Sequence, residues 1–169
     1  MTGRDELNAV LAGINAAKEA QIPVKINTVH YQHLDWKSIL DYTNRVQIPV
    51  RFIEMMPVGL GKQFRGRNRE EILSVLAQAF GRPREYGGRL GSGPAVYVQF
   101  PGFQGRIGFI SAVSHQFCDS CNRVRLTSTG NLKPCLQYGA GADLRKLMRD
   151  GETDDRIEAV MRETIFRKP

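Results

Sequence analysis

Helical and strand-like patterns of apolar residues alternate over the N-terminal part of the chain. Apolar side chains recur at helical spacing over residues 4–20 and again over residues 36–46. A run of mostly β-branched and other apolar residues follows each predicted helix, at residues 24–29 and 50–56. Strands that alternate with helices at this spacing indicate parallel pairing through crossover helices. Two parallel strands do not form a stable sheet alone, so we expect further strands to complete it.

The alternation of helix and strand ends after Gly59. We expect a short amphipathic helix over residues 70–80, followed by a hairpin whose two strands cover residues 95–100 and 106–113. Two closing helices are predicted over residues 143–149 and 153–166. The stretch over residues 81–94, between the helix at residues 70–80 and the hairpin, is rich in Gly and Arg and is predicted to be a surface loop. The pattern therefore predicts two parts, a β/α part over residues 1–59 and an α+β region over residues 60–169.

The composition is that of a folded protein and excludes several classes. Of the 169 residues, 41% are hydrophobic and 24% are charged, which rules out wholesale disorder. No apolar run approaches the roughly 20 residues of a membrane span, and the N-terminus lacks a signal-peptide pattern. Three cysteines, an odd number, argue against a secreted disulfide framework. We therefore expect a cytoplasmic protein that is not inserted in a membrane and uses its cysteines for another purpose.

The formal net charge of +7 predicts an anionic partner. The charge alone leaves nucleic acid, an acidic membrane surface and a nucleotide open. Seven of the 24 basic residues lie between Lys62 and Arg89, and two more, Arg123 and Arg125, directly follow a cysteine pair. The position of this second group matters more, because it places positive charge beside the candidate chemistry.

All three cysteines, Cys118, Cys121 and Cys135, fall within one short window of the sequence. Two thiolates three positions apart on a tight turn can reach one centre, and a hairpin with its turn near Gly130 would return the third. This clustering indicates a metal site. A structural zinc ion would take His115 as a fourth ligand. A four-iron cluster held by three cysteines would instead leave one iron open to a substrate, and the spacing leaves both metals open.

The residues around the cysteines resemble those of a known family. Residues 117–127 and 130–136 closely resemble the C-terminal cluster motif of the molybdenum cofactor biosynthesis protein A family, the radical-SAM GTP 3',8-cyclases. Residues 23–29, 50–59 and 101–105 are similar to family segments in the same order. The resemblance covers nearly the whole chain. It implies the C-terminal part of an incomplete (β/α) TIM-like barrel, with two parallel strands and their helices, followed by an α+β cluster-binding region.

The resemblance also implies roles for individual residues. In the family, an N-terminal cluster cleaves S-adenosylmethionine to a radical that attacks GTP, and a second [4Fe-4S] cluster binds the guanine. Cys118, Cys121 and Cys135 match the ligands of this second cluster. Matching positions imply contacts to GTP at Lys25, Arg51, Arg123, Val124 and Arg125. The position of Met56 implies a backbone contact to S-adenosylmethionine.

One departure from the family pattern changes the expected function. The sequence contains no Cys-x-x-x-Cys-x-x-Cys, the motif that ligates the radical-generating cluster in the family. We therefore expect the GTP-binding half of a lyase of molybdenum cofactor (molybdopterin) biosynthesis, inactive alone. It would use S-adenosylmethionine only together with the missing N-terminal radical-SAM half. Its expected partners are GTP and either this missing half or a homodimer partner. The alternative is a zinc-stabilised basic module that binds nucleic acid without catalysis, although nucleic acid is the less favoured partner.

Overall fold

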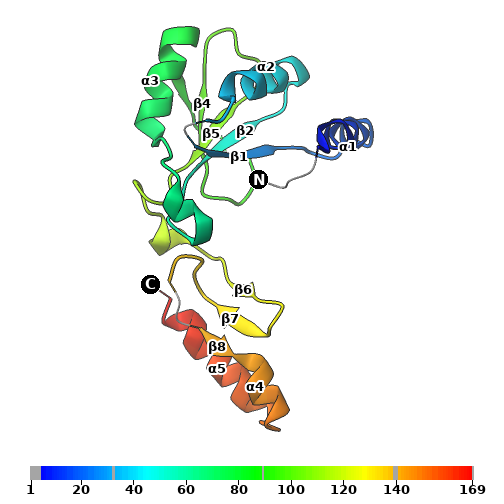
Figure 1. Cartoon of the computed structure of the whole chain (residues 1–169), viewed down its shortest axis with the longest axis vertical. Coiled ribbons are helices and arrows are strands. Elements are labelled where there is room, and N and C mark those ends of the chain that lie inside the picture. Colours follow the sequence, from blue (N-terminus) through cyan, green and yellow to red (C-terminus); the bar gives the residue numbers. More distant parts are fainter. Residues whose placement is uncertain (1–4, 32, 89, 139–140, 169) are drawn as a thin grey trace. The chain divides into compact units, whose positions relative to one another are not determined.

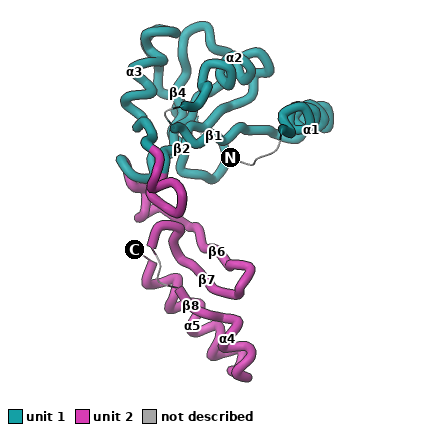
Figure 2. Tube along the Cα trace, viewed as in Figure 1, with its two compact units in different colours: residues 1–55, 65–114 teal, residues 56–64, 115–169 magenta. Residues whose placement is uncertain are grey.

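The protein is described by a computed structural model that covers residues 5–31, 33–88, 90–138 and 141–168. The chain forms two compact units (Figure 2), which comprise Met1–Met55 with Arg65–Ser114 and Met56–Phe64 with His115–Pro169. These units are defined by contacts. The division expected after residue 59 separates regions of different function, and it stays a prediction. None of the helices in the described ranges has the length and apolar character needed to cross a bilayer.

Unit 1 is built on a five-stranded mixed sheet in the order β1-β2-β5-β4-β3 (Figure 1). The strands are β1 (Ile26–His30), β2 (Val50–Glu54), β3 (Arg84–Tyr86), β4 (Val96–Gln99) and β5 (Ile107–Ile110). β1, β2 and β5 are parallel, whereas β4 runs antiparallel to β5 and β3 antiparallel to β4. This arrangement confirms the two parallel strands and the predicted hairpin. It also shows that β5 joins the sheet beside β2 as a third parallel strand.

One expectation for unit 1 was wrong. Residues 84–86, placed by the sequence in a surface loop, form β3 at the edge of the sheet. Arg84 lies opposite Gln99 and Tyr86 opposite Tyr97. The strand forms because β4 offers a free edge, since the segment itself has little intrinsic strand propensity.

Three helices accompany this sheet: α1 (Leu7–Glu19), α2 (Trp36–Val46) and α3 (Arg69–Phe80). The carboxylate of Asp35 caps α2 by accepting a hydrogen bond from the backbone of Ser38 at 3.2 Å. Asn68 and Glu71 form a reciprocal capping box that fixes the start of α3. In contrast, α1 has no side-chain cap and buries none of its residues.

The core of unit 1 lies on one face of the sheet. Val50 and Phe52 of β2 are buried there with Ile107 and Phe109 of β5, because alternate residues of a strand point to the same face. Residues of α2 and α3 belong to the same apolar cluster, among them Leu40, Ile72 and Leu76. Each fully buried side chain of this kind contributes about 1.5–3 kcal/mol. The opposite face is left to the alternate residues, including Asn27, Arg51 and Gly108, which lie side by side in the register.

Unit 2 contains a small antiparallel sheet and two helices. The elements are η1 (Gly59–Gln63), η2 (Cys118–Ser120), β6 (Arg125–Leu126), β7 (Asn131–Lys133), β8 (Ala142–Asp143), α4 (Leu144–Arg149) and α5 (Asp154–Phe166). β6 and β7 form the predicted hairpin, and α4 and α5 are the predicted closing helices (Figure 1). Gly130 allows the hairpin turn, since its φ of +83° is a conformation that residues with a Cβ rarely adopt. The whole chain is thus a mixed α/β protein with a partly parallel sheet.

Candidate functional site

The cysteine pair of unit 2 lies on a single tight turn. Cys118 begins η2, and the backbone N–H of Cys121 donates to the carbonyl of Cys118 at 3.0 Å. Cys135 lies two residues after the end of β7, the return strand of the hairpin. All three thiols are free and half-buried. The predicted local geometry is therefore present, with a turn that carries two thiols and a hairpin that precedes the third.

The surroundings of Cys121 favour its thiolate form. The pKa of its thiol is lowered, chiefly by a hydrogen bond from the backbone N–H of Arg123 and further by the ammonium group of Lys168. Partial burial of the thiol acts in the opposite direction. Lys168 Nζ lies 3.2 Å from Cys121 Sγ. The thiolate is the form of cysteine that binds metals and acts as a nucleophile, so these contacts favour the reactive form of Cys121.

The described residues contain no group of three or more His, Cys, Asp or Glu side chains arranged to hold a metal ion. The chemistry of the donors nevertheless fits a thiolate-bound metal, because soft sulfur ligands suit iron–sulfur clusters and zinc. His115 belongs to no such group either. The joint ligation of one metal centre by Cys118, Cys121 and Cys135 remains a prediction.

The segment that follows the cysteine pair carries the predicted GTP contacts of unit 2. Arg123 precedes β6, and Arg125 is its first residue and lies opposite Lys133 of β7. Arg123, Val124 and Arg125 are all exposed. Neither arginine forms an ion pair within the described ranges of the chain. By charge and exposure, both side chains suit an anionic ligand.

Lys25 and Arg51, the predicted GTP contacts of unit 1, are held by neighbouring polar groups. Lys25 directly precedes β1, and its Nζ donates to the carbonyl of Leu90 at 2.6 Å. Arg51 Nε donates to Asn27 Oδ1 at 2.7 Å across β1 and β2. Gly108 gives the Arg51 side chain room, because a Cβ there would lie 3.1 Å from Arg51 Cγ. These contacts form a polar patch on the face of the sheet opposite the core.

Met56, the predicted backbone contact for S-adenosylmethionine, lies just beyond the end of β2 and is half-buried. Its carbonyl accepts a hydrogen bond from the N–H of Val58 at 2.8 Å. Met56 belongs to unit 2, with the cysteines and Arg123, whereas Lys25 and Arg51 belong to unit 1. The structure describes the two groups separately.

Two residues with well-defined contacts near the site were not expected from the sequence. Glu54 ends β2, and its Oε2 accepts hydrogen bonds from the N–H groups of Val113 and Ser114, each at 2.8 Å. Lys168 contacts the cysteine turn from the segment after α5. The partners are 45 to 60 residues apart in the chain, so no local pattern could have revealed them.

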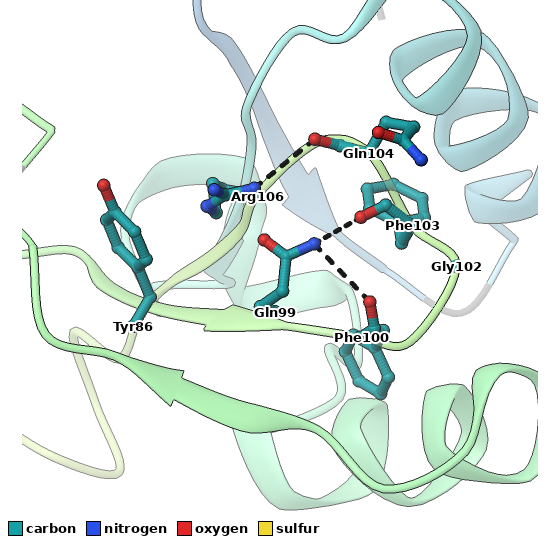
Figure 3. A pocket seen from close by; sticks show the side chains of 7 residues that line it. All are labelled: Tyr86, Gln99, Phe100, Gly102, Phe103, Gln104 and Arg106. Atoms are coloured by element: carbon teal, nitrogen blue, oxygen red, sulfur yellow. Dashed lines mark hydrogen bonds between the residues drawn. The ribbon is translucent and has the colours of Figure 1, made fainter.

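A cavity of about 460 Å³ lies elsewhere in unit 1 (Figure 3). Its lining includes Tyr86, Gln99 and Arg106, and the Arg106 guanidinium stands 4.9 Å from the centre of the Tyr86 ring. Arg106 precedes β5, and its carbonyl accepts from Val50 N at the start of β2. The cavity therefore lies at the amino ends of the parallel strands and contains none of the predicted site residues.

Together, the partly parallel α/β sheet and the thiol-bearing turn beside two exposed arginines define an α/β protein with a candidate metal-thiolate and anion site. Residues 48–169 match the Molybdenum Cofactor Synthesis C family. The chain belongs to this family, and the resemblance seen in the sequence motifs is confirmed.

Three relatives of the chain share the name GTP 3',8-cyclase. This chain is 39% identical over 166 residues to a GTP 3',8-cyclase of Clostridium perfringens strain SM101, in an alignment that covers 96% of this chain and 51% of the relative. The GTP 3',8-cyclase of Heliobacterium modesticaldum is 38% identical, covering 96% of the chain and 52% of the relative. The GTP 3',8-cyclase of Desulforamulus reducens is 37% identical, in an alignment that covers 100% of this chain and 54% of the relative. The chain therefore spans about half the length of these relatives.

Proposed function

We propose that this chain is the substrate-binding half of a GTP 3',8-cyclase of molybdenum cofactor biosynthesis. The observation that carries the proposal is the match to relatives of that name over 96–100% of the chain. The matched family region also contains all three cysteines and the two arginines that follow them.

Cys118, Cys121 and Cys135 would hold a [4Fe-4S] cluster in this proposal. When bound, a cluster with three cysteine ligands supplies one open iron site to which a base atom of the substrate can bind. The residues that follow would orient the rest of the nucleotide. Arg123 and Arg125 each present several N–H donors, which suit phosphate or base oxygens, and Val124 provides an apolar contact between them.

Lys25 and Arg51 would add positive charge for the triphosphate from unit 1. Both groups are already oriented by protein acceptors, the carbonyl of Leu90 and the amide oxygen of Asn27. Such pre-orientation reduces the conformational entropy that ligand binding would otherwise cost. Met56 would contribute its backbone to the binding of S-adenosylmethionine.

The rest of the enzyme would complete the sheet at β1. Within the described residues, β1 pairs with β2 alone, so its other edge is free. The apolar residues Leu7 and Val10 of α1 are 63% and 56% exposed, as expected for a helix that packs on strands outside this chain. We infer that a radical-SAM half pairs with this edge to form the TIM-like barrel, of which residues 1–59 would be the last units.

The same reasoning predicts that this chain alone does not complete the reaction. Its three cysteines are all assigned to the substrate-binding cluster, so the cluster that cleaves S-adenosylmethionine must be supplied by the radical-SAM half.

Anaerobic reconstitution with iron and sulfide tests the cluster directly. We expect a brown protein with thiolate-to-iron absorption near ~400 nm, and loss of this absorption in Cys118→Ser, Cys121→Ser and Cys135→Ser. His115→Gln is the matched control and should retain the absorption. A colourless protein that binds zinc stoichiometrically, and loses it in His115→Gln, would contradict the proposal and support the zinc-stabilised alternative.

A further inference from the structure

Lys168 makes three contacts with the turn that carries the cysteine pair. Its Nζ donates to the carbonyl of Cys121, to Cys121 Sγ at 3.2 Å and to the carbonyl of Arg123 at 2.9 Å. An ammonium group has three N–H donors, so this geometry uses all of its hydrogen-bonding capacity. Lys168 is half-buried, although it lies beyond the end of a surface helix.

The neighbouring residues direct Lys168 toward the turn. The N–H of Arg167 and that of Lys168 donate to the carbonyls of Glu163 and Ile165 at the end of α5, at 3.0 and 3.2 Å. The Arg167 guanidinium turns back to its own helix and pairs with Glu163 at 2.7 Å. Two consecutive basic residues therefore have different roles, since one contacts the helix and the other the cysteine turn.

The contacts constrain both the backbone and the sulfur of the turn. The carbonyls that Lys168 holds belong to Cys121 and Arg123, the residues on either side of Asn122. Holding both carbonyls fixes the orientation of the two peptide planes to which they belong. This orientation also determines where the Arg123 side chain leaves the backbone. The third contact places a positive N–H donor on the sulfur itself, and hydrogen bonds to ligand sulfurs raise the reduction potential of an iron–sulfur cluster.

We propose that Lys168 is a positioning residue that ties the segment after α5 to the cysteine turn and thereby sets the direction of Cys121 Sγ and of Arg123. The effect on a bound cluster rests on the proposed function. The tether itself does not, because its three hydrogen bonds join only atoms of this chain.

Hydrogen exchange of the metal-free chain tests the tether. The amide groups of Ser120 and Cys121 donate within the turn, to the carbonyls of Phe117 and Cys118. In Lys168→Met we expect the peptide over residues 117–125 to exchange about tenfold faster, because hydrogen bonds to a charged group are lost. Lys168→Arg should exchange at an intermediate rate. Arg167→Ala, which removes an adjacent charge without touching the turn, and peptides of unit 1 should match the wild type.

An unchanged exchange rate over residues 117–125 in folded Lys168→Met would overturn the tether. Equal acceleration in Arg167→Ala would also overturn it, since the effect would then come from the helix end or from net charge. If Lys168→Met does not fold, the comparison of Lys168→Arg with the wild type decides. Identical exchange rates over residues 117–125 and identical cluster reduction potentials in these two proteins would overturn the proposal.

The reduction potential of the reconstituted cluster tests the contact with the sulfur. We expect a more negative midpoint potential in Lys168→Met than in the wild type, and no change in Arg167→Ala. An unchanged potential in Lys168→Met would overturn the role of Lys168 toward the ligand sulfur. If the wild-type chain takes up no iron, the proposed function fails, whereas the exchange experiment still decides whether Lys168 tethers the turn.

Discussion

Arg123 is exposed, and its side chain has no carboxylate partner within the described ranges, while its carbonyl is held by Lys168. We predict that Arg123→Ala weakens GTP binding by about 10- to 100-fold. The reason is the loss of charge-assisted hydrogen bonds, which are worth about 1.5–3 kcal/mol. Thermal stability should hardly change, because an exposed side chain is removed.

Titration calorimetry of the reconstituted chain measures this affinity. Arg162→Ala is the matched control, since Arg162 lies on α5 and pairs with Glu158 at 2.6 Å. It removes the same charge from the same unit and should bind GTP as the wild type does. Equal affinities of Arg123→Ala and the wild type would remove Arg123 from the site.

His30 ends β1 and is 2% exposed. Burial lowers the pKa of its imidazole below the ordinary value of 6.5, and the charge of Arg67 lowers it further. Glu71 and a backbone hydrogen bond act in the opposite direction. The folded state therefore binds fewer protons than the unfolded state. Stability from His30 is fully present above the unfolded pKa and is lost as the pH falls from about 6.5 toward the folded pKa.

We predict that the free energy of unfolding decreases between pH 7.5 and 5.5 and that His30→Gln reduces this slope. Urea denaturation at several pH values measures it. His33→Gln, at an exposed position three residues further along the chain, should keep the slope of the wild type. The same slope in His30→Gln and in the wild type would show that His30 does not cause the pH dependence.

The individual residues of the site were predicted unequally well. The cysteines and the two arginines lie together in one short segment, so spacing and resemblance identify them. Lys168 and Glu54 act through partners 47 and 59 residues away, and their roles depend on how the chain folds back. Asn27 could be recognised only as a polar residue in an apolar strand. Its hydrogen bond with Arg51 depends on the register of β1 and β2, which the sequence does not specify.

Among the elements, the hairpin of β6 and β7 is most closely tied to the cysteine region, because it separates the pair from Cys135. Its turn depends on Gly130, where an added Cβ would lie 2.4 Å from Arg145 Cβ and the φ is +83°. We predict that Gly130→Ala destabilises unit 2 by at least about 1–2 kcal/mol, the cost of this backbone conformation for an alanine. Chemical denaturation followed by circular dichroism measures the change.

Gly13 provides a control of opposite sign. It lies within α1, and an added Cβ would meet no atom within 4 Å. Gly13→Ala should stabilise the protein by about 0.5–1 kcal/mol, because alanine is the better helix former. A Gly130→Ala variant as stable as the wild type would mean that the hairpin turn tolerates a side chain.

The elements with a clear hydrophobic period were predicted correctly. α2 and α3 have apolar residues at helical spacing and side-chain caps, so their sequences alone indicate where they begin. β3 was missed because Arg84, Glu85 and Tyr86 form a strand only through pairing with β4. Likewise, the parallel pairing of β5 with β2 joins segments more than 50 residues apart, which local patterns do not specify.

For the molecule as a whole, the sequence predicted an α/β protein that needs further strands, and the sheet has that character. β5 supplies one neighbour for β2, but β1 keeps a free edge within the described residues. This agrees with a chain that spans 51–54% of its relatives. The incomplete TIM-like barrel and the role of a second half are implied by the resemblance and remain proposals.

The central claim is that the three cysteines hold a cluster to which GTP binds directly. The most direct test is electron paramagnetic resonance of the reduced, reconstituted chain with and without GTP. We predict that GTP changes the spectrum of the cluster and that ATP at the same concentration does not, because the base itself would occupy the open iron site. A spectrum unaffected by GTP, or changed equally by ATP, would contradict the claim.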